Sequence, residues 1–140
     1  MKISVIGCGY LGAVHAAAMA DLGHEVVGID VDEDKITQLQ SGKAPFFEPG
    51  LPEVLASALA SGRLRFTTDI AQAAGSEVHF IAVGTPQSRD SQAADLSYVD
   101  AAVLALVVVA QLDVLRRELE RTGDIFVLVH QHDRRNAHGQ

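Results

Sequence analysis

Cysteine is almost absent from this sequence, since Cys8 is the only one among 140 residues. A single thiol forms no internal disulfide bond and supplies no cysteine cluster for a metal ion. Three histidines near the end, His130, His132 and His138, are the alternative ligands. They stand among Asp, Arg, Asn and Gln, a composition typical of a solvated tail, so we expect no metal site.

Basic residues and long apolar runs are also scarce. Eleven Lys and Arg stand against eighteen Asp and Glu, which gives a formal net charge of −7 and argues against nucleic acid as a partner. The longest apolar run, residues 101–110, is shorter than the roughly 20 residues of a membrane span. A glycine-rich turn interrupts the apolar start, which therefore does not match a signal peptide. We expect a cytoplasmic protein with no membrane partner.

Glycine, in contrast, stands in an informative pattern. Gly7, Gly9 and Gly12 directly follow an apolar stretch and open a helical pattern. A second apolar run, residues 26–29, ends in Asp30, 18 residues after Gly12. The order strand, glycine turn, helix, strand and acid is typical of a dinucleotide-binding site.

Each part of this pattern has a physical reason. The first glycine permits a tight turn, the second lets the backbone approach a pyrophosphate, and the third lets helix and strand pack closely. Free N–H groups and the helix dipole then favour the phosphates. Cys8 and Tyr10 are expected to act through their backbone amides.

Asp30 favours NAD over NADP. It is expected to accept hydrogen bonds from the adenosine ribose, whereas a 2′-phosphate at about 5 Å would be repelled by several kcal/mol at a dielectric near 20. Lys35 could receive such a phosphate, but residues 32–34 surround it with negative charge. In the alternative interpretation, Asp32 caps a helix running to about Ser41, and Lys35 is an ordinary solvated lysine.

Strand and helix patterns alternate along the chain. We predict an α/β fold of Rossmann type, with a doubly wound, mainly parallel sheet of about five strands and helices on both faces. Pro52 suits the first turn of one helix, and a short helix follows Thr68 or Asp69. The predicted strands are Lys2–Ile6, Glu25–Ile29, Leu64–Thr67, Val78–Val83 and Ile125–His130, and the predicted helices stop at Gly23, Gly42, Gly62 and Gly75. We assign residues 1–130 to one NAD-binding domain and residues 131–140 to a polar tail.

Two further segments are candidates for the site. Phe46 and Phe47 lie in a loop with two prolines and either shape a site or cover the sheet as a packed connection. Thr85 follows the fourth predicted strand, which flanks the point where strand order reverses. Thr85 is therefore either a hydrogen-bond partner of the cofactor or part of a plain turn.

Five motifs together resemble the UDP-glucose 6-dehydrogenases of the UDP-glucose/GDP-mannose dehydrogenase family. The resemblance covers about residues 1–103 and implies an amino-terminal NAD-binding domain. It also implies NAD-dependent, two-step oxidation of the C6 hydroxyl of a nucleotide sugar to a carboxylate. The motifs are Gly7-Cys8-Gly9-Tyr10-Leu11-Gly12, Gly28-Ile29-Asp30-Val31-Asp32 with Lys35, Phe47-Glu48-Pro49-Gly50-Leu51, Val83-Gly84-Thr85-Pro86 and Asp95-Leu96-Ser97-Tyr98-Val99.

The resemblance also assigns site residues. The glycine turn, with Tyr10 and Leu11, would contact the pyrophosphate, Asp30 and Lys35 would hold the adenosine side, and Thr85 would lie close to the dinucleotide. The cofactor-binding set is Gly7, Gly9, Tyr10, Leu11, Gly12, Asp30, Lys35 and Thr85.

The sequence departs from the family after about Val103. The family's substrate domain, with its catalytic cysteine, has no counterpart here, and Cys8 cannot replace it because it lies in the pyrophosphate turn. We therefore predict no catalytic residue, no activity of the chain alone, and a nucleotide-sugar partner only where a second domain is supplied. Residues 104–130 are atypical and suggest truncation or rearrangement near residue 103. Their leucine spacing predicts an amphipathic helix ending near Gly123.

Other functions stay open from the sequence. The chain could derive from a GDP-mannose or UDP-N-acetylmannosamine dehydrogenase, because the pocket that selects the sugar is not in it. It could be a stand-alone NAD-binding sensor, or an interaction module or homo-oligomer that associates through the apolar face around residues 107–109. It could also be a relic that folds poorly.

Overall fold

The computed structural model describes residues 1–88 and 93–122. Within them, four parallel strands form one sheet in the order β3-β2-β1-β4. This confirms the Rossmann-type class. The fifth predicted strand, Ile125–His130, the three tail histidines and the polar tail lie outside the described residues. The strands are β1 (Lys2–Ile6), β2 (Glu25–Ile29), β3 (Leu64–Thr67) and β4 (Val78–Ile81).

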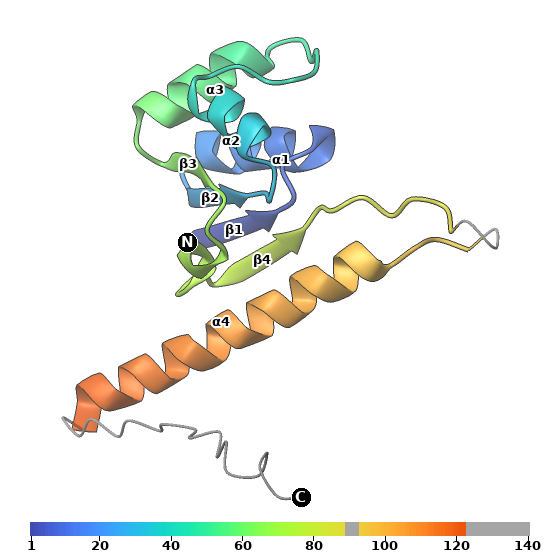
Figure 1. Ribbon diagram of the computed structural model, residues 1–140. Coiled ribbons are helices and arrows are strands. Elements are labelled where there is room, and N and C mark those ends of the chain that lie inside the picture. The colour runs from blue at the N-terminus through green and yellow to red at the C-terminus, as the bar shows by residue number, and fades with distance from the viewer. Residues whose placement is uncertain (89–92, 123–140) are drawn as a thin grey trace, which may run out of the picture.

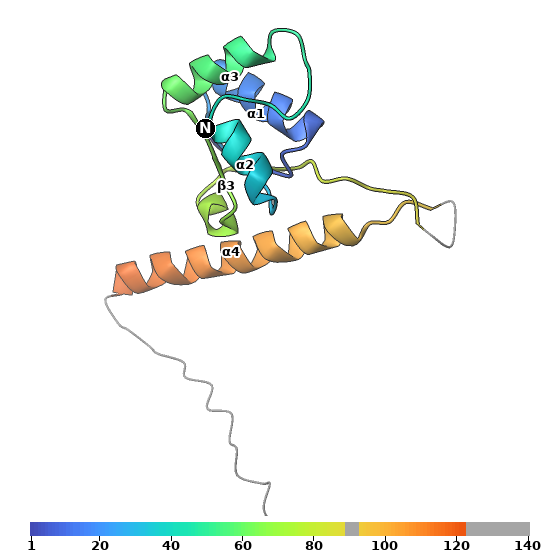
Figure 2. The same cartoon turned by 45° about the horizontal axis from the view of Figure 1, so that its top comes forward.

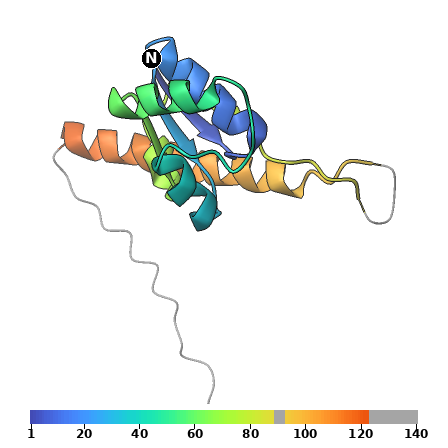
Figure 3. The ribbon, with the colours of Figure 1, turned by 90° about the horizontal axis from the view of Figure 1, so that it is seen from above.

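Helices cover both faces of the sheet. On one face lie α1 (Tyr10–Asp21), α2 (Glu33–Gln40) and α3 (Leu51–Ala60), and on the other lie the short 3-10 helix η1 (Ile70–Ala73) and α4 (Ser97–Thr122). Figure 2 also separates α4 from α1 and α3, and Figure 3 shows the molecule from above, with the helices of one face in front of the strands. Two apolar clusters, one on each face, hold the layers together. Leu39 and Leu55 are fully buried in the larger cluster, and such burial contributes about 1.5–3 kcal/mol per side chain.

Local sequence determines where the helices begin. The carboxylate of Asp32 accepts a hydrogen bond from the Lys35 N–H at 3.0 Å and caps α2, as predicted. Asp69 caps η1 in the same way through the Ala71 N–H. Pro52 lies in the first turn of α3, where its missing N–H costs no helical bond.

The strands end level at one edge of the sheet. Ile6 lies opposite Ile29 on one side and Ile81 on the other. We predicted that the fourth strand would run to Val83, but β4 ends two residues earlier, because β1 turns away at Gly7 and no longer pairs with it. The residues that follow β1, β2 and β4 therefore meet at this edge.

The helix α4 ends at Thr122, which confirms the predicted end near Gly123. Its 26 residues span about 39 Å, whereas a strand of five residues spans about 17 Å. Figure 1 shows α4 running antiparallel to β4 and extending past the sheet.

We predicted no membrane span, yet Ser97–Arg121 is long and apolar enough to cross a membrane by length and composition. The prediction considered only the unbroken apolar run that ends at Ala110. It did not consider the apolar residues that follow Gln111 in the same helix. Core helices of soluble proteins satisfy the same criterion, so the finding is weak support for a span.

Candidate cofactor-binding site

The glycine turn begins where β1 ends. Gly7 has φ +94°, a conformation that side chains rarely adopt, and its N–H donates to the Ile29 carbonyl at 2.7 Å. A Cβ on Gly7 would lie 2.8 Å from the carbonyl oxygen of Ala82. The turn is therefore pressed between the ends of β2 and β4, and only glycine fits there.

The other two glycines differ in how much space surrounds them. A Cβ on Gly12 would lie 1.8 Å from the carbonyl oxygen of Gly7, so the first turn of α1 packs directly on the glycine turn. A Cβ on Gly9 would have no atom within 4 Å among the described residues. Gly9 thus opens onto the space from which a ligand can approach the backbone.

The start of α1 is suited to bind an anion. Gly9 is the N-cap, and no side chain of the described part of the chain caps this helix. The N–H groups of the first turn and the positive end of the helix dipole therefore face outward, an arrangement that favours phosphate. These features fit the diphosphate of a dinucleotide.

Asp30 directly follows β2 and is linked to the glycine turn. Its Oδ2 accepts hydrogen bonds from the Cys8 N–H at 2.7 Å and from Lys35 Nζ at 2.9 Å, and its Oδ1 accepts one from the Asp32 N–H at 3.0 Å. The side chain is 9% exposed. Because a carboxylate offers about four acceptor positions, room is left on Oδ1 for a further donor.

These contacts keep Asp30 ionised. Partial burial raises the pKa of this carboxyl, but the hydrogen bonds from Lys35, Asp32 and Cys8, together with the Lys35 charge, outweigh burial and hold the pKa below its ordinary value. Lys35 is therefore an ion-pair partner of Asp30 rather than a freely solvated lysine. The Cys8 N–H, which we expected to face the pyrophosphate, instead donates to Asp30.

The Cys8 thiol itself is unsuited to nucleophilic chemistry. It is fully buried in the apolar cluster beneath α1. Burial, and then the nearby Asp30 charge, raise the pKa of Cys8 to about 12, while Lys35 lowers it in part. A thiol in this state carries almost no thiolate near neutral pH.

A mainly apolar pocket of about 310 Å³ lies beside Asp30 at the carboxyl edge of the sheet. It extends from the glycine turn to the first turns of α4, and a flat aromatic base fits a pocket of this kind. The lining residues are Ile6, Gly7, Ile29, Asp30, Val31, Thr68, Ile70, Val83, Tyr98, Ala101, Ala102 and Ala105.

Of the eight predicted site residues, Gly7 and Asp30 line this pocket, and the other six lie outside it: Gly9, Tyr10, Leu11, Gly12, Lys35 and Thr85. Thr85 is exposed on the segment after β4, and Leu11 is exposed on the first turn of α1. The Tyr10 hydroxyl donates a hydrogen bond to Glu48, and its ring packs edge-on against Phe46. The backbone of Tyr10 and Leu11 remains part of the helix start, and the role of Thr85 stays a prediction.

The loop with two prolines only partly covers the core. Phe46 packs against the larger apolar cluster, as the packed-connection interpretation predicted, but Phe47 is 88% exposed. Through Phe46 and Glu48 the loop contacts Tyr10 at the start of α1.

Sequence reasoning missed the contribution of α4. Tyr98, Ala101, Ala102 and Ala105 line the pocket, although they are nearly 70 residues from Asp30 along the chain. Tyr98 is part of one of the five motifs, but the sequence alone assigned it no role in binding. Two small alanines one turn apart, at 101 and 105, were a weak signal that something packs or binds there.

A parallel sheet with this glycine turn, an uncapped helix start and an acid after the second strand defines a Rossmann-type dinucleotide-binding domain. The sequence profile of the UDP-glucose/GDP-mannose dehydrogenase family, NAD binding domain, matches residues 1–115. The chain belongs to this family, and NAD is the dinucleotide that its site is built for.

Individual relatives agree with this assignment. The chain is 56% identical over 103 residues to the UDP-glucose 6-dehydrogenase of Rhizobium meliloti, covering 73% of this chain and 24% of that protein. It is 44% identical over 101 residues to the GDP-mannose 6-dehydrogenase of Pseudomonas syringae, covering 71% and 23%. A UDP-glucose dehydrogenase structure from Pyrobaculum islandicum superposes with a TM-score of 0.70 at 48% identity, covering 74% and 24%. The chain thus spans about a quarter of the length of these relatives.

Proposed function

We propose that the chain is the NAD-binding part of a UDP-glucose 6-dehydrogenase, which oxidises UDP-glucose to UDP-glucuronate with NAD. The observation that carries the proposal is the identity of 56% to the rhizobial UDP-glucose enzyme, against 44% to the GDP-mannose enzyme over a stretch of similar length. The two matches are of nearly equal length, 103 and 101 residues. A cytoplasmic location accords with this proposal.

The chain's own residues would hold and orient NAD, and bound NAD would supply the hydride acceptor. The N–H groups at the start of α1 would bind the diphosphate, and the apolar pocket beside Asp30 would receive the adenine. The free acceptor position on Asp30 Oδ1 suits a ribose hydroxyl, which can donate a hydrogen bond. A 2′-phosphate at the same place cannot donate when ionised and would be repelled by the carboxylate. This contrast supports NAD over NADP.

Calorimetric titration with NAD, NADP and UDP-glucose in parallel tests the proposed binding. We expect NAD to bind, NADP to bind at least tenfold more weakly, and UDP-glucose to give no heat with this chain alone. Equal affinity for NADP would contradict the role given to Asp30.

The chain alone is proposed to be inactive. Cys8 is buried and its pKa is raised to about 12, so it supplies no nucleophile. Purified protein mixed with NAD and UDP-glucose should give no NADH absorbance above background. Steady NADH formation would show that the catalytic groups are present in this chain after all.

A stand-alone NAD-binding module is the second candidate. The complete turn, Asp30 and pocket support it, because all three lie within the described residues. Addition of a polypeptide that carries the family's substrate domain separates the two candidates: restored turnover favours the dehydrogenase, and NAD binding without any turnover favours the module.

A further inference from the structure

The helix α4 is apolar on two opposite sides. Ala102 and Val109 are buried against the sheet and η1, where Leu106 packs beside them. On the opposite side, five large aliphatic side chains are between 40% and 67% exposed. Their spacing of four, four, three and four residues places them along one side of the helix. We call them the α4 stripe: Leu104, Val108, Leu112, Leu115 and Leu119.

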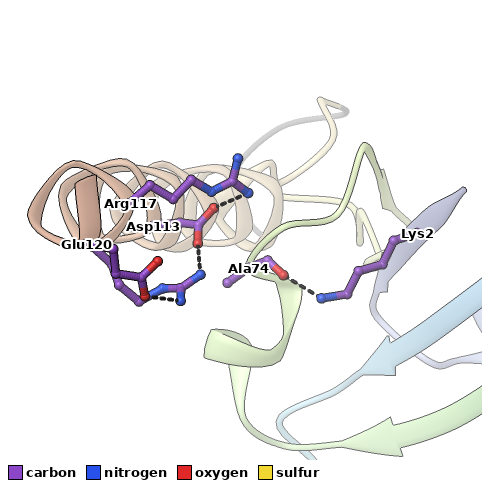
Figure 4. A network of polar contacts seen from close by, with 6 residues as sticks. Lys2, Ala74, Asp113, Arg117 and Glu120 are labelled. Carbon is purple, nitrogen blue, oxygen red and sulfur yellow. Dashed lines mark hydrogen bonds and ion pairs between the residues drawn. The ribbon is translucent and has the colours of Figure 1, made fainter.

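The inner side of α4 also carries a polar network. Asp113 follows Val109 by one turn on the inner side of α4, and its side chain is only 9% exposed. It pairs with Arg116 at 3.0 Å and with Arg117 at 2.7 Å (Figure 4). Opposite, Lys2 Nζ donates to the Ala74 carbonyl at 2.6 Å, as Figure 4 also shows. Both ion pairs of Asp113 lie within α4. The burial of Ala102, Val109 and Asp113 on the inner side therefore leaves the stripe facing outward.

The stripe has the size of one half of a stable interface. With the exposed neighbours Val103, Val107 and Val114, eight aliphatic side chains present apolar surface to the outside. At about half exposure they amount to on the order of 500 Å². A standard interface buries about 800 Å² per partner, of which somewhat more than half is apolar. The five side chains of the stripe and these three valines, together with a polar rim, therefore meet that requirement.

Charge favours a second copy of the same helix as the occupant. The stripe contains no charged residue, and the C-terminal part of α4, residues 113–121, carries three acidic and three basic side chains. The whole of α4 has four acids and three arginines, a net charge of −1, so six of the chain's seven excess negative charges lie elsewhere. Two copies therefore repel each other least at this face. A bilayer spanned by α4 would have to take up Asp113 and its arginines, which is costly.

We infer that two copies of this chain associate through their α4 stripes about a two-fold axis, with the i, i+4 ridges of the two helices packed against each other. A two-fold contact joins identical patches, and the middle of the stripe lies on or near the axis. Leu112 is closest to that middle, midway between Leu104 and Leu119. Side chains at position 112 of the two copies consequently meet.

Cross-linking of the full chain tests this geometry. The variant Leu112→Cys should form a covalent dimer on mild oxidation, because its two thiols are adjacent in the pair. Leu22→Cys is the matched control, since Leu22 is 70% exposed at the end of α1, away from the stripe, and should stay monomeric under denaturing conditions. The native Cys8 is buried and does not contribute. Equal cross-linking of both variants, or of neither, would overturn the inference.

Mass measurement by light scattering provides the second readout. The unmodified chain should show twice the monomer mass at tens of micromolar, Leu115→Asp should show the monomer mass, and Leu22→Asp should remain a dimer. Circular dichroism should be unchanged in all three, because both positions are exposed. A monomeric unmodified chain would overturn the inference.

Two other occupants would also overturn it. A chain ending at residue 122 that dimerises while the full chain is monomeric would show that residues 123–140 cover the stripe. Stripe-dependent binding to phosphatidylcholine vesicles, lost in Leu115→Asp and without dimer formation in solution, would show that lipid covers it.

Discussion

Gly9 and Gly12 lie only three residues apart, yet alanine should affect the stability of the fold very differently at the two positions. At Gly12 the new Cβ would lie 1.8 Å from the Gly7 carbonyl oxygen, so we expect a loss of about 3 kcal/mol in the free energy of unfolding. At Gly9, where φ is −68° and the Cβ meets no atom of the described residues within 4 Å, stability should change by no more than about 0.5 kcal/mol.

The variant that keeps its stability, Gly9→Ala, should be the one that loses NAD affinity. The Cβ in Gly9→Ala points into the space proposed for the diphosphate, so calorimetry should show at least a tenfold loss of NAD affinity in a stably folded protein. Urea denaturation gives the stability of both variants. Undiminished NAD binding by Gly9→Ala would remove the diphosphate from this turn.

Asp30 should contribute to binding through hydrogen bonds to the ribose. Replacement by alanine is expected to weaken NAD binding by about 1.5–3 kcal/mol, the range for a hydrogen bond with one charged partner. Asp34→Ala is the matched control, because it removes an exposed carboxylate from the same helix start. If both variants titrate like the original chain, Asp30 does not lie in the NAD site.

The ion pair of Asp30 should also appear in the pH dependence of stability. The pKa of Asp30 is lowered in the folded protein, so its ionised form stabilises the fold at pH values above the unfolded pKa of about 3.9. This contribution is lost as the pH falls through the folded pKa. Denaturation of the original chain and of Asp30→Asn at a series of pH values should therefore give a difference that is constant near neutrality and shrinks in acid. A difference that does not change with pH would contradict this assignment.

The residues of the site were predictable from sequence to the extent that they are local. Gly7 and Asp30 directly follow the ends of β1 and β2, and Gly12 lies in the first turn of α1, so each is placed by the element next to it in the sequence. Tyr98 and Ala101 reach the pocket only because α4 crosses beneath the sheet. Such contacts depend on how far a helix extends and how it packs, which the spacing of one segment does not reveal.

At the level of secondary-structure elements, the contribution of the Asp32 cap to the stability of α2 can be tested. The Asp32 carboxylate satisfies the Lys35 N–H, so Asp32→Ala should lower the free energy of unfolding by about 1 kcal/mol. Glu33→Ala, which removes a charge from the first turn but no capping bond, should cost less. Urea denaturation measures both. An equal loss in the two variants would mean that charge, rather than the capping bond, stabilises the start of α2.

The strands and helices differ in how well their bounds were predicted. β1, β2 and β3 match the predictions to the residue, because each is a short apolar run enclosed by turn residues. β4 was predicted too long, since Ala82 and Val83 are apolar enough for a strand but lie beyond the end of β1. Similarly, the start of α4 at Ser97 was not recognised, because the aspartate before it marks a loop and a helix start equally well: Asp95 accepts the Ser97 N–H at 2.9 Å.

On the scale of the whole molecule, the candidate site is assembled from both layers. The turn after β1 and the start of α1 come from one side, whereas the pocket wall formed by Tyr98 and Ala102 belongs to α4 on the other. NAD bound there would contact both the start of α1 and α4, which lie on opposite faces of the sheet. A ligand in this position binds the folded state alone and must therefore raise its stability.

Thermal unfolding in the presence of ligands measures this coupling. NAD at 100 times its dissociation constant should add about 2.7 kcal/mol, which for a domain of this size raises Tm by about 10 °C. UDP-glucose at the same concentration should leave Tm unchanged, because we propose that the sugar binds only where a second domain is supplied. Protein concentration is held constant, since association through the α4 stripe would itself shift Tm. A rise with UDP-glucose equal to that with NAD would show that this chain holds a nucleotide-sugar site of its own, and the division of labour proposed for it would be wrong.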